Sequence, residues 1–133
     1  MQIIHFDRSQ DVPIVDAKIR GPLGARKVRL VFDTGCGLSQ IDTSLIENIG
    51  YGAVDGDQRI QIHGATGESH QGYRLRIAEL TFFGVKFKEV TVGALDFEFL
   101  GSHRIDGLLG FDLIKELHLE VNGPRGELKI LKG

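Results

Sequence analysis

Short runs in which apolar and polar residues alternate recur along most of the chain. Alternation with a period of two is typical of strands that bury one face, and 18 glycines against three prolines can supply the tight turns between them. The pattern predicts hairpins within 12–33, around the sequence GPLG, and within 59–80 and 117–131, and a further strand over 84–95. The chain is therefore expected to be mostly β.

Two segments have a helical spacing instead. The stretch TSLIENIG (43–50) has an apolar face and ends in Gly50, a residue type that commonly terminates helices, while Thr43 or Ser44 can cap its start. The stretch FDLIKEL (111–117) directly follows an apolar run and predicts a second, brief helix. We expect both helices to be short.

Length and composition limit the number of domains and the kinds of partner that are expected. A chain of 133 residues with 41% hydrophobic and 26% charged residues predicts one globular domain over residues 1–133. Lys and Arg are scattered and the pI is near 6.2, so no nucleic acid is expected as a partner. The N-terminal decapeptide lacks the apolar core of a secretory signal, and no run approaches the roughly 18 to 20 apolar residues of a membrane span. The expectation is a soluble chain without a membrane partner, with the cytoplasm favoured.

Cys36 is the single cysteine of the chain. One thiol excludes an intrachain disulfide and a thiolate zinc site built from one chain. A nucleophilic role would require a histidine partner, and none is close in sequence. A small apolar residue beside a turn is the favoured interpretation of Cys36.

The stretch VRLVFDTGCGLSQID (28–42) raises a chemical question, because a run of β-formers ends in an aspartate. An ionised carboxylate is costly to bury unless it is paired or hydrogen-bonded. Gly35 allows a sharp turn that brings backbone N–H groups close to Asp33, an arrangement that suits a catalytic acid. A turn or helix-cap aspartate is the structural alternative. A phosphate loop at GCGLS is disfavoured, because the third glycine and a Gly-Lys-Ser/Thr sequence are missing.

Two motifs in a fixed order carry a family resemblance. VFDTG (31–35) and IDGLLG (105–110), with a glycine-rich hairpin between them, resemble the aspartic peptidases, specifically their small retropepsin-like branch. The resemblance spans about residues 11–131. It implies an all-β, retropepsin-like acid-protease barrel with one or two short helices, and neither a cofactor nor a metal.

The resemblance also implies a reaction and an assembly. Peptide hydrolysis without a metal needs one carboxylate as general base and one carboxylic acid to protonate the carbonyl oxygen. Two carboxyl groups about 3 Å apart share a proton, because both cannot ionise. The chain has one Asp-Thr-Gly sequence, so the second Asp33 is expected from a partner copy. The expected function is an aspartic endopeptidase, active as a homodimer on peptide or protein substrates.

By the same resemblance, each candidate site residue has a role. Asp33 would be catalytic, Thr34 would hydrogen-bond across the dimer axis, and the Gly35 N–H would support the carboxylate. The tip of the long hairpin would form a flap that closes over the substrate and binds it as an added strand. This flap is expected to comprise His63, Gly64, Ala65, Thr66 and Gly67.

The chain departs from the family pattern at Gly37. The family usually has Ser or Thr there, whose hydroxyl donates to the catalytic carboxylate, and glycine cannot donate from a side chain. One hydrogen bond to a charged group contributes about 1.5 to 3 kcal/mol, and Ser39 or the thiol of Cys36 are candidates to replace it. The departure keeps a second interpretation open, a catalytically weak or inactive module that binds peptides or proteins on the same fold. A third is a monomer that pairs only on activation.

Overall fold

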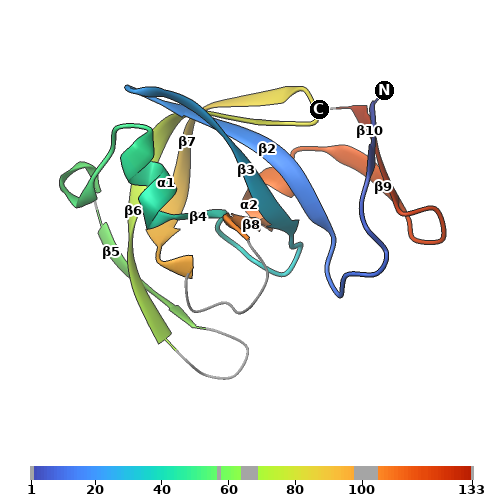
Figure 1. Ribbon diagram of the computed structural model, residues 1–133, viewed down its shortest axis with the longest axis horizontal. Coiled ribbons are helices and arrows are strands. Elements are labelled where there is room, and N and C mark those ends of the chain that lie inside the picture. Colours follow the sequence, from blue (N-terminus) through green and yellow to red (C-terminus); the bar gives the residue numbers. More distant parts are fainter. Residues whose placement is uncertain (1, 57, 64–68, 98–104, 133) are drawn as a thin grey trace.

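The computed structural model describes residues 2–56, 58–63, 69–97 and 105–132 (Figure 1). Two short α-helices and a 3₁₀ turn accompany the strands. The strands are β1 (Gln2–His5), β2 (Ile14–Gly21), β3 (Gly24–Phe32), β4 (Gln40–Asp42), β5 (Gln58–His63), β6 (Ser69–Phe82), β7 (Val85–Leu95), β8 (Gly107–Leu109), β9 (His118–Asn122) and β10 (Glu127–Lys132). The helices are α1 (Thr43–Asn48), η1 (Ala53–Asp55) and α2 (Phe111–Ile114).

The larger sheet closes into a barrel. Its strand order is β2-β3-β8-β4-β7-β6-β5, and an additional pairing of β2 with β6 closes a ring of six strands from which β5 extends. A separate three-stranded sheet, β1-β10-β9, brings the two ends of the chain together and lies at the right of the barrel in Figure 1. The prediction of an all-β barrel with one or two short helices is confirmed.

The predicted hairpins are present. β2 and β3 pair antiparallel from Ile14↔Val31 to Gly21↔Gly24 around the GPLG turn, and β9 and β10 pair likewise at the C-terminal end. The long hairpin consists of β5 and β6, paired from Gln58↔Arg74 to His63↔Ser69. In β2 and β3 the alternation reflects burial, because one side of each strand faces the inside of the barrel.

The core fills the inside of the barrel. On β2, Val15, Ala17 and Ile19 are buried and the residues between them are exposed. The rings of Phe32 and Phe82 stack at a centroid distance of 6.3 Å and join this core. The core therefore fixes β3, the strand that ends immediately before Asp33.

The structure corrects the prediction for the start of α1. Thr43 is already the first helical residue and Asp42 is the N-cap, so neither Thr43 nor Ser44 caps the helix. The Asp42 carboxylate instead accepts hydrogen bonds from the backbone N–H of Phe97, at 3.0 Å, and from the Ser44 hydroxyl. The side chain that ends β4 thus holds two neighbouring segments together. Gly50 follows α1 with φ of 105°, the left-handed conformation expected of a stop.

Two further differences concern β1 and α2. β1 was not predicted, because its run QIIH is too short to show alternation, and it forms by pairing with β10. α2 ends at Ile114 rather than at residue 117. None of the helices in the described part of the chain is long and apolar enough to cross a membrane.

Candidate active site

The candidate site lies where β3 and β8 end side by side. β8 lies between β3 and β4, parallel to β3 with Phe32 opposite Leu109 and antiparallel to β4 with Ile41 opposite Gly107. The two motifs that are about 75 residues apart in the sequence therefore meet in space. The backbone N–H of Asp33 donates to the carbonyl oxygen of Leu109 at 2.9 Å, which continues the ladder into the turn.

Asp33 sits at the first position of a tight turn. Its side chain is half-buried, and its Oδ1 accepts a hydrogen bond from the backbone N–H of Gly35 at 2.9 Å. Its own carbonyl oxygen accepts from the N–H of Cys36 at 3.2 Å. Thr34 and Gly35 are exposed at the tip of the turn. The turn thus presents a carboxylate stabilised by one backbone donor, beside an exposed threonine.

The two candidates to replace the missing hydroxyl of residue 37 are engaged elsewhere. The Ser39 hydroxyl, fully buried, donates to Asp112 Oδ1 at 2.8 Å and accepts from the Gly110 N–H at 2.8 Å. The Cys36 thiol donates to the Leu38 carbonyl oxygen at 3.0 Å. These contacts direct both groups into the turn itself rather than to Asp33.

Asp112 is a component that sequence reasoning left without a role. Its carboxylate accepts from the backbone N–H of Ser39 at 3.0 and 3.1 Å as well as from the Ser39 hydroxyl. The Phe111 N–H adds a 2.6 Å hydrogen bond to the carbonyl oxygen of Cys36. The first turn of α2 therefore holds residues 36–39. In the sequence, the role of Asp112 could have been suspected from its position in the first turn of the helix predicted directly after IDGLLG.

Gly107 and Gly110 of the second motif are required by close packing. A Cβ on Gly110 would lie 2.7 Å from the Cys36 carbonyl oxygen and 3.0 Å from the Ser39 nitrogen, while one on Gly107 would collide with the carbonyl oxygen of Gln40. Any side chain at these positions would displace backbone. Asp106, next to Gly107, accepts from the Arg29 N–H at 2.7 Å and fastens β8 to β3.

Cys36 lies between two carboxylates. Burial raises the pKa of its thiol, the hydrogen bond to the Leu38 carbonyl opposes this, and the negative charges of Asp33 and Asp112 add to the rise. The thiol therefore stays protonated at neutral pH, which agrees with its interpretation as a small apolar residue beside a turn.

The flap prediction falls largely outside the described residues. His63 is the last residue of β5, and Gly64, Ala65, Thr66 and Gly67 are not described. Among the residues that are described, no cluster of His, Cys, Asp and Glu could hold a metal ion.

Comparison with known proteins agrees with this geometry. A family model described as aspartyl protease matches residues 15–113, which contain both motifs. Similar solved structures include a retropepsin-like aspartic protease from Rickettsia conorii, with a TM-score of 0.68 at 16% identity over 98% of this chain and 97% of that one. The retroviral protease-like domain of Ddi1 from Leishmania major gives a TM-score of 0.60 at 15% identity, over 90% and 88% of the two chains. No curated protein matches the sequence. The matched family model covers most of the chain, which therefore belongs to the aspartyl protease family and has a retropepsin-like fold.

Proposed function

We propose that the protein is an aspartic endopeptidase that acts as a homodimer. The observation that carries this proposal is the position of Asp33, at the end of β3, hydrogen-bonded to β8 through its N–H and to Gly35 through its carboxylate. The sequence has one Asp-Thr-Gly, and the reaction needs two carboxyl groups. A second copy related by a two-fold axis supplies the other one.

In this proposal each residue of the turn has a task. One Asp33 carboxylate removes a proton from water while the partner's Asp33, protonated, donates to the carbonyl oxygen of the peptide. The Gly35 N–H stabilises the ionised form of Asp33. Thr34, exposed at the tip, contacts the partner turn. The hairpin of β5 and β6, with the flap His63–Gly67 at its end, binds an extended peptide as an added strand.

The unit proposed to act is the whole chain. The family match ends at residue 113, but β9 and β10 follow α2 directly and β10 pairs with β1. Residues 1–133 are therefore proposed to form one protomer.

One observation favours a second function, a peptide- or protein-binding module on the same fold. Gly37 provides no hydroxyl, and the Ser39 hydroxyl and Cys36 thiol are bonded within their own loop. With fewer donors on its carboxylate, the turn is less well equipped to hold an ionised Asp33. A module of this kind would bind an extended chain without cleaving it.

Hydrolysis of a diverse peptide library between pH 4 and 7, followed by mass spectrometry, tests both functions. Asp33→Asn is expected to reduce cleavage by about a thousandfold or more, because one acid and one base are removed from each dimer. Asp11→Asn, at an exposed position, is the matched control and should cleave like the unaltered protein. Unchanged cleavage by Asp33→Asn would reject the peptidase. Protection of bound peptides without cleavage in any variant would establish the binding module instead.

A further inference from the structure

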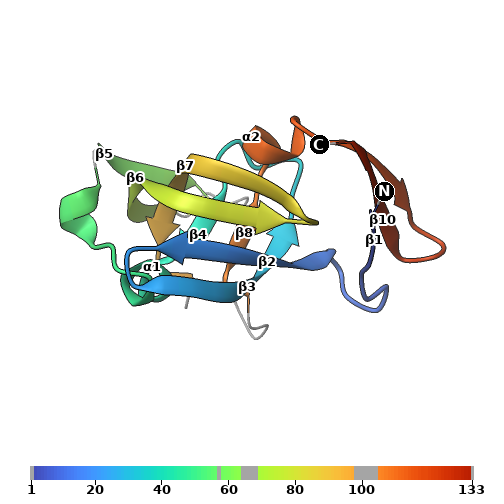
Figure 2. The ribbon, with the colours of Figure 1, turned by 90° about the horizontal axis from the view of Figure 1, so that it is seen from above.

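A surface rich in basic residues lies on one side of the barrel and has no part in the proposed reaction. Seen from above in Figure 2, β3, β2, β6 and β7 lie next to one another and form one continuous surface. We call this surface the basic face. The charged residues in its cross-strand rows are Asp16, Lys18, Arg20, Lys27, Arg29, Glu79, Lys86 and Lys88, and the exposed Glu89 adjoins Lys88 on β7.

Strand register arranges these residues in rows that run across the strands. In one row Lys27 is opposite Lys18, Lys18 opposite Thr81, and Thr81 opposite Lys86. A neighbouring row places Arg20 opposite Glu79 and Glu79 opposite Lys88. The side chains point outwards because the residues on either side of them in β2 and β6, such as Ile19 and Leu80, are buried.

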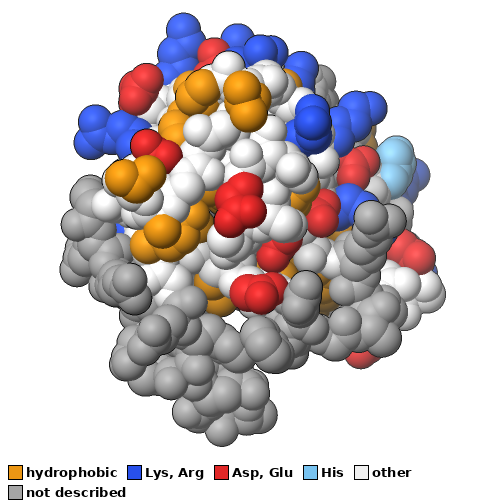
Figure 3. All heavy atoms as spheres, turned by 60° about the vertical axis from the view of Figure 1, so that its left-hand side comes forward, with side chains coloured by type: hydrophobic (Ala, Val, Ile, Leu, Met, Phe, Trp, Pro, Cys, Tyr) orange, Lys and Arg blue, Asp and Glu red, His pale blue; other side chains and the backbone are white. Residues whose placement is uncertain are grey.

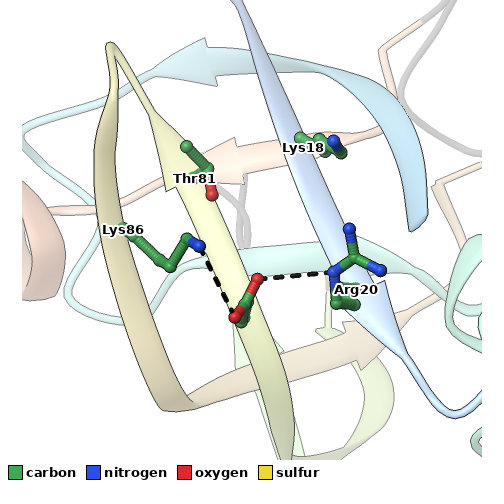
Figure 4. A pocket seen from close by; sticks show the side chains of 5 residues that line it. Lys18, Arg20, Thr81 and Lys86 are labelled. Atoms are coloured by element: carbon green, nitrogen blue, oxygen red, sulfur yellow. Dashed lines mark ion pairs between the residues drawn. The ribbon is translucent and has the colours of Figure 1, made fainter. Parts of the chain in front are cut away.

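Figure 4 shows the centre of the basic face. Glu79 forms ion pairs with Arg20 at 3.4 Å and with Lys86 at 3.8 Å, whereas Lys18 points into the same hollow and joins neither pair. The hollow has a volume of about 190 Å³ and is lined by these four residues and Thr81. Pockets for small molecules are usually about 300 Å³ or larger. The hollow is thus suited to single side chains rather than to a whole small ligand.

The stability of the barrel does not explain this arrangement. Like charges directly opposite each other on neighbouring strands are destabilising, and Lys18 faces Lys27. Lysines often protect exposed sheet edges from aggregation. Here, however, β2 pairs with both β3 and β6, so Lys18 is not on an edge. A role in binding would explain why the destabilising pair of Lys18 and Lys27 is present.

Charge is segregated in the molecule. The four strands β2, β3, β6 and β7 carry nine of the 16 basic residues but only three of the 18 acidic ones, so the rest of the chain has seven basic and fifteen acidic residues. Figure 3 shows Lys and Arg along the upper rim, where these strands lie, and Asp and Glu mainly below it. An anionic partner would therefore be attracted to this face although the net charge is −2.

We propose that the basic face binds an acidic segment of a polypeptide, rich in Asp and Glu. An extended chain places alternate side chains roughly 7 Å apart and neighbouring strands are about 5 Å apart, so carboxylates of such a segment can reach Lys18, Lys27 and Lys86 together. Surfaces for single-stranded nucleic acid combine basic with aromatic side chains, and the rows contain no aromatic residue and include Asp16 and Glu79. A polypeptide is also the substrate class of the family to which the chain belongs.

The basic face is distinct from the candidate active site. Arg29, its residue nearest to Asp33 along β3, precedes it by four residues, a separation of about 13 Å in a strand. Binding there leaves the turn at Asp33 free. The inference goes beyond the proposed peptidase, since binding requires no cleavage.

Titration of a fluorescent oligo-glutamate peptide into the full chain tests the inference, in the Asp33→Asn background so that cleavage cannot interfere. The triple variant Lys18→Gln/Lys27→Gln/Lys86→Gln should bind about tenfold more weakly, since three ion pairs at an exposed surface are lost. The matched control changes three exposed basic residues elsewhere, Arg8→Gln/Lys115→Gln/Arg125→Gln, and should stay within about twofold. Binding should also weaken as salt is raised.

Several results would overturn the inference. They are an absence of binding at low salt, an equal loss in the control triple variant, and tighter binding of an oligonucleotide of equal charge that the Lys18 triple variant abolishes. Low-salt association of the protein with itself that the same variant abolishes would assign the face to a second copy instead. Circular dichroism of the triple variant checks that it is folded. Failure of the peptidase assay leaves this result unaffected.

Discussion

The strands β3 and β8 are neighbours that both finish in apolar residues but lead into different ends. With Phe32 opposite Leu109, the next residues, Asp33 and Gly110, occupy equivalent positions; Asp33 begins a tight turn and Gly110 precedes α2. At the end of β3 a half-buried carboxylate is presented on a turn. At the end of β8 there is no space for a side chain, because Gly110 packs against the backbone of Cys36 and Ser39.

The two strand ends therefore have different tasks: one supports the turn, and the other presents the carboxylate of Asp33. The end of β8 is a support made of close backbone contacts and the half-buried carboxylate of Asp112. The end of β3 is held by that support and exposes Thr34 and Gly35. Precise placement of a reactive group depends on such supporting contacts. Changes at β8 should therefore affect stability, and changes at β3 should affect chemistry.

A large effect on stability is expected from Gly110→Ala. The added Cβ would lie 2.7 Å from the Cys36 carbonyl oxygen, and overpacking of this kind costs about 3 kcal/mol. Urea unfolding measures the loss. Gly37→Ala, where a Cβ meets nothing within 4 Å, is the control and should change the free energy of unfolding by less than about 0.5 kcal/mol. Equal effects at the two glycines would remove the distinction between the two strand ends.

Ser39→Ala should lower the free energy of unfolding by about 2 kcal/mol, because it leaves the buried N–H of Gly110 without its acceptor and removes one hydrogen bond to the half-buried carboxylate of Asp112. Ser9→Ala provides a matched control. The Ser9 hydroxyl also donates to an aspartate, Asp7, at 2.7 Å, but at an exposed position. Its loss should cost less than about 0.5 kcal/mol. If Ser39→Ala were as harmless in urea unfolding, Asp112 would not hold the loop.

Gly37→Ser tests whether a hydroxyl at residue 37 changes the pH dependence of peptide cleavage. A Cβ at residue 37 meets nothing within 4 Å, so the exposed turn has space for the side chain but must shift for the hydroxyl to reach Asp33. When the hydroxyl donates to Asp33 it favours the ionised carboxylate. The acidic limb of the pH profile for peptide cleavage should then move to lower pH by about one unit. Gly37→Ala should leave the profile in place. A shift of the same size in both variants would show that the hydroxyl has no role.

The smallest effect concerns Cys36. Burial raises the pKa of its thiol in the folded protein, so the unfolded state loses this proton first as pH rises. Stability should therefore decrease slightly above about pH 8.5, the ordinary value for a thiol. Urea unfolding between pH 7 and 10 should show this decrease in the unaltered protein and a smaller one in Cys36→Ala. Identical pH dependence in the two proteins would contradict the assigned burial.

Much of the fold follows from local patterns. Alternation predicted the hairpins β2–β3 and β9–β10, and one side of β2 and of β10 is indeed buried. The order of the two motifs indicated the family. β1 escaped prediction because it exists only through pairing with β10, at the other end of the chain. The N-cap was wrong because a distant segment, at Phe97, takes part in fixing the Asp42 side chain.

The site was also predicted only in part, because some of its contacts join sequence neighbours and others join distant residues. Asp33 and its Gly35 donor are neighbours in sequence, so their hydrogen bond follows from a tight turn. The bond between Ser39 and Asp112 joins residues 73 positions apart, and only the pairing of β3 with β8 brings them together. The roles of Thr34 and the flap require a partner copy and a substrate, and they stay predictions.

The central claim is that two copies of Asp33 form one active site, and mixed dimers test it most directly. Differently tagged copies of the unaltered chain and of Asp33→Asn are co-expressed, the dimer carrying both tags is purified, and its cleavage of a library peptide is measured. The proposal predicts that the mixed dimer has less than about 1% of the activity of the unaltered dimer, because the acid–base pair is incomplete. A mixed dimer with half of the unaltered activity would contradict it, since each copy would then act alone.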